Sequence, residues 1–393
     1  MLSSLLCPTR VLSFEDLSPA DFAQAVAYLG RGPLKVAVLV DGRPFPERER
    51  LVAGLRRAYE TVLLDRVSPD PLASDIDAML GSGALAGAEL LVGIGGGSVL
   101  DSAKALAALA PAPGARLADC LGPAPSRRLE AKGLPLLLVP TTAGTGAEVT
   151  KVGVYRDGTG RKHTLGSPFL QADAALLVGA LAAAMPPELA ASTGFDALDH
   201  ALESLWNRNA APATIEAATE AAVAVLGRLP RSYEAARALA AGGRPDPAAA
   251  LAMLEASAMA GFAFGITGTA MGHALSFVLT EEWRVPHGAA CAFSIEDCLR
   301  WARRDPAIEA RLGRVGAAAL GVPPGRGAEA LLGRILELKA AMGLPSSFRE
   351  LGVELGPGEL RRRFARAFED PKMANTRPAA EPEAVYAFLE AKA

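Results

Sequence analysis

With 393 residues, the chain is long enough for two domains that each bury a core of their own. Its 40 basic and 43 acidic residues are spread along the chain and give a net charge of -3, so no basic surface for nucleic acid or for an anionic membrane is indicated. No uninterrupted apolar run of about 18 residues exists to span a bilayer. These features predict a small molecule as the partner.

The cysteines and the N-terminus indicate the compartment. The 4 cysteines are too few for a disulfide framework and show no CxxC spacing: Cys7, Cys120, Cys291 and Cys298. The first residues, MLSSLLCPTR, lack the long apolar core behind a charged start that a secretory signal would have. We therefore expect a cytoplasmic protein.

Short apolar runs bounded by glycine or proline alternate with helical patterns in the first half of the chain. Such runs are typical of strands buried on both faces of a parallel sheet, with helices on each side. They are KVAVLV (35–40), TVLL (61–64), ELLVGI (89–94) and LPLLLVP (134–140).

The pattern changes after MPPELAA (185–191), where Ala, Leu, Glu and Arg recur at helical spacing between glycine and proline clusters. We place a domain boundary near Pro186. The sequence thus predicts an α/β domain over 1–185 and an all-helical domain over 186–393.

The run at 89–94 leads directly into GGGSVLDSAKALAAL (95–109), a glycine turn followed by a helix. Three consecutive glycines let the backbone approach a ligand closely, and the helix N-terminus offers free N–H groups and a positive dipole end to a phosphate. A ligand-free interpretation is also open, with Ser98 as the helix N-cap and Asp101 completing a variant of the capping box. The GxGxxG dinucleotide motif is absent, because Ser98 stands at its third glycine position.

A second glycine and threonine segment, TTAGTGAEVT (141–150), follows the run at 134–140. Its hydroxyl and amide groups suit the pyrophosphate and ribose of a dinucleotide that lies across the carboxyl ends of parallel strands. Asp41, directly after the run at 35–40, is placed to accept from the adenosine ribose, although a turn-forming Asp-Gly pair explains it equally well. Together the three segments favour a dinucleotide cofactor.

Three of the 4 histidines occur in the second half of the chain. Asp196 and His200 are four positions apart in GFDALDHALE, so both side chains lie on one helix face and can reach one cation, although such pairs are also common as salt bridges. His273 and His287 lie in MGHALSFVLTEEWRVPHG, where a lone histidine is usually a core residue. A four-ligand metal site explains all four residues at once. We interpret the remaining His163 as loop structure or a cofactor contact.

Imidazole and carboxylate ligands suit iron(II) or zinc better than calcium or magnesium. Such an ion beside a nicotinamide can act as a Lewis acid that binds an alkoxide or carbonyl oxygen while hydride passes between carbon atoms.

These motifs resemble those of the iron-containing (group III) alcohol dehydrogenases in the dehydroquinate-synthase-like superfamily. The resemblance spans most of the chain in family order: GGGSVLDSAK (95–104), PTTAGTGAEVT (140–150), GFDALDHALE (194–203), HALSFVLTEEWRVPHG (273–288) and, weakly, DPKMANTRP near the C-terminus. It implies an N-terminal α/β dinucleotide-binding domain and a C-terminal all-α metal-binding domain. It also implies metal and cofactor in the interdomain cleft, and commonly a homodimer.

Carried over by position, the resemblance also implies the site residues. The metal ligands would be Asp196, His200, His273 and His287, holding Fe(II), with zinc as the alternative. We expect NAD(H) rather than NADP(H), because a carboxylate at Asp41 would repel a 2′-phosphate. Besides Asp41, the cofactor contacts would be Gly96, Gly97, Ser98, Asp101, Thr141, Thr142, Thr145, Lys162 and Leu181.

Two positions depart from the family pattern. Many members have a second histidine four residues after the third ligand, near the nicotinamide, and here that position is Phe277. A phenyl ring cannot relay protons and would instead narrow and dry the nicotinamide site, unless it is ordinary helix packing. Val178 replaces the usual acid ahead of the domain boundary. Both departures affect what can be inferred about the identity of the substrate and the route of the proton.

We therefore expect an NAD-linked dehydrogenase that interconverts a small primary alcohol and its aldehyde at the metal. The stretch with Ser276 and Thr280 also resembles a branch that reduces small anionic aldehydes such as phosphonoacetaldehyde. A dehydroquinate-synthase-like lyase would need several Lys and Arg side chains around the metal, and Arg284 is the main one near the ligands. A non-catalytic binding protein conflicts with two complete sites, and a metal-free maleylacetate-type reductase conflicts with the acid at Asp196.

Overall fold

The computed structural model describes residues 8–30, 35–356 and 358–393. Contacts between residues divide the chain into two compact units. The sheet unit holds the described residues up to Met185 together with Ala241–Ala258, and the helical unit holds Pro186–Ala240 and Met259–Ala393. The stretch 241–258, which the sequence pattern groups with the helical half, thus packs within the sheet unit. Cys7 lies outside the described residues, as do the other residues of 1–7.

A parallel sheet forms the centre of the sheet unit. Its 6 strands follow the order β1-β8-β5-β4-β2-β3, and every neighbouring pair is parallel. The strands are β1 (Arg10–Phe14), β2 (Lys35–Val40), β3 (Glu60–Leu64), β4 (Leu90–Gly95), β5 (Leu136–Pro140) and β8 (Ala174–Val178). The four predicted strands are confirmed as β2 to β5. A separate antiparallel hairpin consists of β6 (Val152–Arg156) and β7 (Lys162–Gly166).

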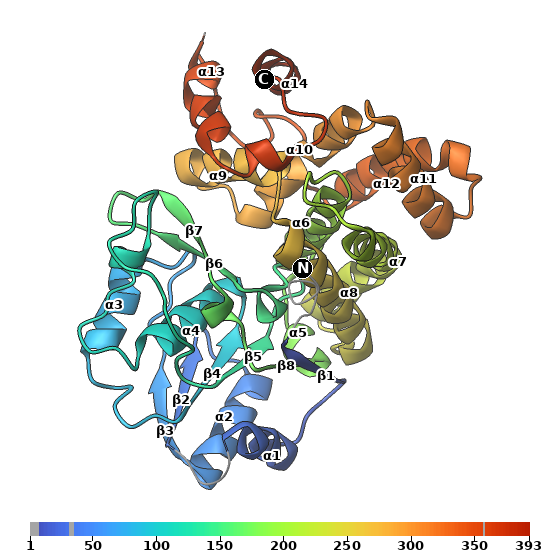
Figure 1. The fold of residues 1–393 in the computed structure, drawn as a ribbon. Coiled ribbons are helices and arrows are strands. Elements are labelled where there is room, and N and C mark those ends of the chain that lie inside the picture. Colours follow the sequence, from blue (N-terminus) through green and yellow to red (C-terminus); the bar gives the residue numbers. More distant parts are fainter. Residues whose placement is uncertain (1–7, 31–34, 357) are drawn as a thin grey trace. The chain divides into compact units, whose positions relative to one another are not determined.

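Helices cover both faces of the parallel sheet (Figure 1), and apolar side chains of the strands pack against them. Along β2, Val36 and Val38 join a core with α1 (Pro19–Gly30) and α2 (Pro46–Ala58). The alternate residues, Ala37 and Leu39, join a second core with α3 (Ala73–Gly81) and α4 (Gly97–Leu109). Burial on both faces explains why these strands are nearly continuous apolar runs in the sequence. The remaining short elements of this unit are η2 (Ala118–Cys120), η3 (Ala147–Val149), η4 (Pro168–Leu170) and α5 (Gly179–Ala182).

The regular elements described in the helical unit are all helices. They are α6 (Pro187–Leu205), α7 (Pro212–Ala240), α9 (Met271–Trp283), α10 (His287–Ala302), α11 (Pro306–Leu320), α12 (Pro324–Ala341), α13 (Glu359–Phe364), η5 (Ala365–Glu369), η6 (Met373–Asn375) and α14 (Pro382–Glu390). Helix α6 is buried along most of its length and packs against α7 and α10, and α10 packs against α9. An α/β half with a parallel sheet and an all-helical half therefore confirm the predicted fold class.

Helix α8 (Pro247–Thr267) continues from one unit into the other. Among the described residues it is the one helix long and apolar enough to cross a membrane by length and composition, although Glu255 interrupts it and 61% of its most apolar window is buried in the protein. Buried core helices pass the same test, so α8 is weak support for a membrane span.

Candidate functional site

The predicted metal ligands come from three helices of the helical unit. Asp196 and His200 lie one turn apart on α6, His273 is in the first turn of α9, and His287 is the first residue of α10. Gly288 lets α10 begin close to α6, because a Cβ atom at this position would lie 2.2 Å from the carbonyl oxygen of Ser192. The packing of these helices brings residues far apart in the sequence to one place.

The three imidazoles converge on a single oxygen atom. Asp196 Oδ1 lies 3.8 Å from His200 Nδ1, 3.5 Å from His273 Nε2 and 3.7 Å from His287 Nε2. These distances are long for hydrogen bonds. They match a shared cation, because two donors about 2.1 Å from a tetrahedral ion lie about 3.4 Å apart.

Among the described residues, Asp196 Oδ1 and His273 Nε2 are buried without a hydrogen-bond partner. An orphaned buried polar atom is destabilising unless something else binds it. Burial by itself would raise the pKa of the Asp196 carboxyl, but the charges of the neighbouring imidazoles outweigh this effect and lower the pKa. Asp196 is therefore ionised, and the residues present fit a divalent cation.

Glu203 orients His273 from the side opposite Asp196. Its carboxylate is fully buried and accepts from His273 Nδ1 at 2.8 Å and from the backbone N–H groups of Ala270, Gly272 and His273 at 2.6, 2.7 and 3.3 Å. A carboxylate accepts, so Glu203 holds a proton on His273 Nδ1 and leaves Nε2, which faces Asp196, as the ring atom available to a metal. Glu203 thus caps the N-terminus of α9 and fixes the tautomer of a predicted ligand.

Our sequence reasoning missed Glu203 and its neighbour Asp199, whose Oδ2 lies 3.3 Å from His273 Nδ1. A signal was available, because positions 196, 199, 200 and 203 share one helix face. Burial, followed by the charge of Glu203, raises the pKa of Asp199 to about 7. Glu203 is consequently the ionised partner of His273, and Asp199 is partly protonated near neutral pH.

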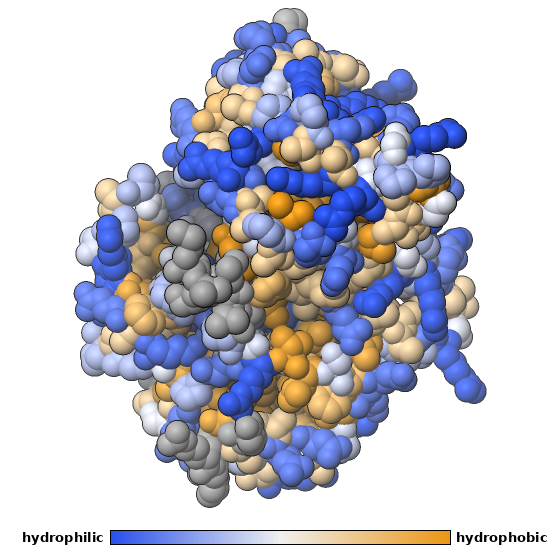
Figure 2. Space-filling model, turned by 45° about the vertical axis from the view of Figure 1, so that its right-hand side comes forward, coloured by the Kyte–Doolittle hydropathy of each residue, from blue (hydrophilic) through white to orange (hydrophobic). Residues whose placement is uncertain are grey.

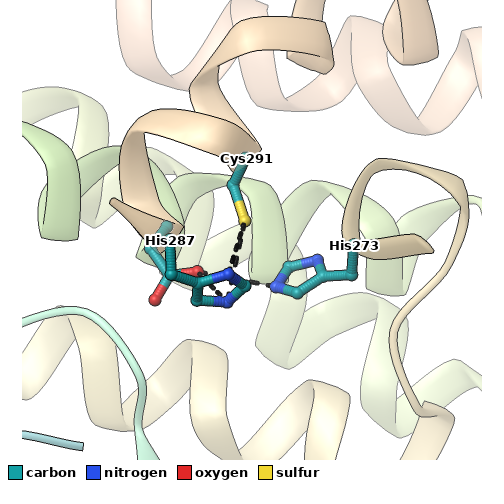
Figure 3. Close-up of side chains that lie close together, drawn as sticks. His273, His287 and Cys291 are labelled. Carbon is teal, nitrogen blue, oxygen red and sulfur yellow. Dashed lines mark hydrogen bonds and ion pairs between the residues drawn. The ribbon is translucent and has the colours of Figure 1, made fainter. Parts of the chain in front are cut away.

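A thiol completes the compact set of donor atoms. One donor atom from each of Asp196, His273, His287 and Cys291 lies within 4.8 Å of the others. Figure 3 shows the Cys291 sulfur directed at the His287 ring, with His273 beside it; the sulfur lies 3.8 Å from His287 Nε2. Burial raises the pKa of this thiol to about 12, so it is not a nucleophile by itself.

The two predicted cofactor segments of the sheet unit lie against each other. A Cβ atom at Gly96 would lie 3.3 Å from Thr142 Cγ2, and one at Gly97 would lie 2.7 Å from Thr145 Cγ2. The glycines are therefore needed for close packing of the turn after β4 on the loop after β5. Thr141 joins the same contact by donating its backbone N–H to the carbonyl of Gly95 at 3.0 Å.

The capping-box interpretation of the glycine turn is wrong. Helix α4 begins at Gly97 with Gly96 as N-cap, and no side chain caps it. Ser98 Oγ instead accepts from the backbone N–H of Asp70 at 3.2 Å, and Asp101 Oδ2 accepts from the backbone N–H of Val154 at 2.9 Å. Both side chains tie α4 to neighbouring segments because the turn starts the helix earlier than a serine cap would.

Asp70 is a residue that the sequence did not reveal. Its backbone is left-handed, with φ of 53°, and its Oδ1 lies 2.7 Å from Lys162 Nζ. It therefore joins two predicted cofactor residues, Ser98 and Lys162. The Ser-Pro-Asp-Pro sequence at 68–71 marks a turn but gives no sign of this role.

The other predicted positions fall in different surroundings. Asp41 follows β2, and its Oδ1 is bound by Arg48 Nη1 at 2.7 Å. Leu181 is buried in the core between the sheet and α1 and α2, where Val178 also lies. His163 is on β7, with Nε2 2.7 Å from Asp157 Oδ2, so within the hairpin it acts as a structural residue.

Three features indicate a metal-dependent, nucleotide-binding class of protein. The sheet unit has a parallel sheet covered on both faces and a glycine turn at the end of a strand. The helical unit has a buried cluster of a carboxylate and imidazoles. Residues 8–178 match the family described as iron-containing alcohol dehydrogenase, and residues 190–393 match the family described as Fe-containing alcohol dehydrogenase family, C-terminal. The chain belongs to the iron-containing alcohol dehydrogenase family, as the resemblance predicted.

Individual relatives agree with this membership. The chain is 40% identical over 204 residues to the long-chain-alcohol dehydrogenase 1 of Geobacillus thermodenitrificans, covering 52% of this chain and 49% of that protein. It is 33% identical over 300 residues to the phosphonoacetaldehyde reductase of Streptomyces viridochromogenes, covering 73% and 72%. This chain spans about half the length of the first of these relatives and of two further alcohol dehydrogenases that it matches.

Among solved structures, the chain is similar to the sulfoacetaldehyde reductase from Bifidobacterium kashiwanohense in complex with NAD+. The TM-score is 0.84 at 27% identity, covering 98% of this chain and 97% of that chain.

Proposed function

We propose that this protein is a metal-dependent, NAD-linked dehydrogenase that interconverts small primary alcohols and aldehydes. The observation that carries the proposal is the convergence of three imidazole nitrogens on the buried, unpartnered Oδ1 of Asp196 in a member of this family. Asp196, His200, His273 and His287 would hold iron(II), or zinc, which when bound supplies a Lewis acid for the substrate oxygen.

The chain's own residues prepare the site and handle the proton. Glu203 orients His273 through Nδ1, and Phe277 offers no titratable group. Of the two nearby hydroxyls, Ser276 donates to the carbonyl of His273 at 2.9 Å, whereas Thr280 Oγ1 is buried without a hydrogen-bond partner among the described residues. We therefore propose that the proton passes through water, through a hydroxyl such as that of Thr280, or through the cofactor ribose.

The dinucleotide is proposed to bind along the glycine turn and the threonine loop of the sheet unit. This assignment is supported by the contact of Gly96 and Gly97 with that loop and by the N-terminus of α4, which suits a phosphate. NAD rather than NADP is supported by Asp41, which is 36% exposed and still offers its carboxylate to a ribose while Arg48 fixes its orientation.

A small anionic aldehyde is the second candidate substrate, favoured by Lys372. Its ammonium lies 4.0 Å from the centre of the Phe277 ring, which is 6.0 Å from the His287 ring. The ammonium is paired with Asp370 Oδ2 at 3.2 Å, so a sulfonate or phosphonate group would compete with that carboxylate for it. Two similar proteins are named as reductases of phosphonoacetaldehyde and sulfoacetaldehyde.

A homodimer in the cytoplasm is also proposed. Strand β1 is an edge strand whose Val11 and Leu12 are exposed, and apolar side chains gather on the face seen in Figure 2. An exposed apolar edge strand is a template for pairing with a second chain. The cytoplasm is supported by the free thiols of Cys120, Cys291 and Cys298.

The test is aldehyde reduction by protein stripped with a chelator and reloaded with iron(II) or zinc. NADH oxidation with propanal, sulfoacetaldehyde and phosphonoacetaldehyde should appear only after reloading. Lys372→Gln should raise KM for the two anionic aldehydes and leave propanal unchanged, while the control Lys132→Gln, in the sheet unit, should change neither. Equal turnover without metal would contradict the metal-dependent function, and equal KM values in Lys372→Gln would exclude the anionic preference.

A further inference from the structure

We propose that Arg48 determines, together with Asp41, which dinucleotide this protein binds. Arg48 holds the Asp41 carboxylate in position for the adenosine ribose of NAD, and it is also the group that would bind the 2′-phosphate of NADP if that carboxylate were absent. The inference rests on the proposed dinucleotide site and names a specificity-determining residue within it. Asp41 directly follows β2 and Arg48 is in the first turn of α2, so both belong to the sheet unit.

The first argument is the contact between the two residues. Arg48 Nη1 donates to Asp41 Oδ1 at 2.7 Å and to the backbone carbonyl of Asp41 at 3.0 Å. The backbone N–H of Arg43 donates to the same Oδ1 at 3.0 Å. Both donors bind one oxygen of the carboxylate, which holds it in one direction. The other oxygen is then the one to which a ribose hydroxyl can donate.

The second argument is that Arg48 is anchored independently of the Asp41 side chain. Glu49 Oε1 accepts from Arg48 Nε at 3.1 Å and from Nη2 at 2.9 Å, and Nη1 also binds a backbone carbonyl. The centre of the Phe45 ring lies 5.4 Å from the guanidinium carbon, and the Arg48 side chain is only 3% exposed. Removal of the Asp41 carboxylate would therefore release one N–H group of Nη1 in a guanidinium that is already oriented.

The third argument is that a phosphate oxygen can replace Asp41 Oδ1. Charge-assisted N–H···O bonds to carboxylates and to phosphates are both about 2.7–2.9 Å long, so the position 2.7 Å from Nη1 fits either anion. With Asp41 present, two carboxylates face one guanidinium, and the cluster repels a phosphate. Without Asp41, Glu49 balances Arg48, so the repulsion ends where the donor becomes accessible. An arginine near the ribose is the usual partner of a 2′-phosphate.

Arg43 is the rival cation, because its exposed side chain is two positions after Asp41. An exposed arginine loses rotamer freedom when it binds a phosphate, whereas Arg48 is already held by its neighbours. This difference favours Arg48 as the phosphate ligand.

The experiment measures the binding of NADH and NADPH to the full chain by nucleotide fluorescence without aldehyde, so it does not depend on turnover. Asp41→Gly should raise the affinity for NADPH relative to NADH about tenfold or more, because one hydrogen bond to a charged group is gained. Adding Arg48→Gln should remove most of this gain and leave NADH binding, which shows that the double variant is folded. Adding Arg57→Gln instead, at an exposed position on the same helix, should preserve the gain.

Two further variants sharpen the test. Arg48→Met keeps the apolar length of the side chain and serves the same comparison if the glutamine variant does not fold. Arg48→Gln with Asp41 intact should weaken NADH binding, because the carboxylate loses the contact that orients it, and should still exclude NADPH.

The outcomes separate this inference from the proposed function. If Asp41→Gly gains affinity for NADPH and the gain survives Arg48→Gln, or is removed by Arg43→Gln instead, the role of Arg48 is overturned and the dinucleotide site stands. If Asp41→Gly gains none, the placement of Asp41 at the ribose is overturned together with this inference. If wild type binds neither nucleotide, the NAD-linked function fails with them.

Discussion

Replacing Glu203 by glutamine should unfold the helical unit more easily and weaken the metal site at the same time. The carboxylate accepts four hydrogen bonds from the start of α9, two on each oxygen. In Glu203→Gln one oxygen becomes an NH2 group, which cannot accept, so two of the four bonds are lost in either orientation of the amide.

The size of the effect follows from these contacts. Each hydrogen bond to a buried charged group contributes about 1.5–3 kcal/mol, so the loss of two predicts about 3–6 kcal/mol. If the NH2 group faces His273 Nδ1, the ring must also move its proton to Nε2, which removes the lone pair that a metal needs. We therefore expect metal affinity to fall about 10–100-fold.

Tryptophan fluorescence during urea unfolding measures the first effect. All 3 tryptophans, Trp206, Trp283 and Trp301, belong to the helical unit, so the signal reports on that unit alone. Glu188→Gln, an exposed position on the same helix, is the matched control and should stay within about 0.5 kcal/mol of wild type. A Glu203→Gln protein as stable as that control, with unchanged metal affinity, would refute the reasoning.

Three further changes test the cofactor and substrate assignments. Asp41→Gly should raise the ratio of kcat/KM with NADP to that with NAD, and a wild type that already prefers NADPH would show the assignment of Asp41 to be wrong. Phe277→His should change the pH dependence of turnover and the ranking of aldehydes by chain length; if neither moves in a folded, metallated variant, the ring is ordinary packing. Gly97→Ala should weaken NADH binding about tenfold in a fluorescence titration, because the added Cβ would lie 2.7 Å from Thr145 Cγ2 and overpacking costs about 1–3 kcal/mol. The double variant with Thr145→Ser should regain most of the affinity, and no recovery would mean that this contact is not the cause.

The sequence predicted the strands that are continuous apolar runs and missed those whose composition is ambiguous. Strands β2, β4 and β5 are continuous apolar runs because both of their faces are covered, and β3 was also recognised from its run at 61–64. Edge strand β1, RVLSF, is mostly exposed, so burial does not dictate its composition. Strand β8, AALLV, lies in an alanine-rich stretch that is equally compatible with a helix.

At the site, helical spacing identified the residues on one face but not their partners. Asp196 and His200 were recognised because they are the ligand types that a cation needs, four positions apart. Glu203 and Cys291 have the same kind of spacing from a predicted ligand, yet a buried glutamate or a thiol alone has many structural explanations. Asp70 gave no signal, because its contacts depend on a left-handed turn and on residues 28 and 92 positions away.

Metal content tests the central claim most directly. Apoprotein incubated with iron(II) or zinc and then desalted should retain about one ion per chain in wild type. The same should hold for His163→Ala, because the fourth histidine pairs with Asp157 in the hairpin of the sheet unit. His273→Ala should retain almost none while its circular dichroism spectrum remains that of wild type. Equal metal in His273→Ala and wild type, or none in wild type, would contradict the account.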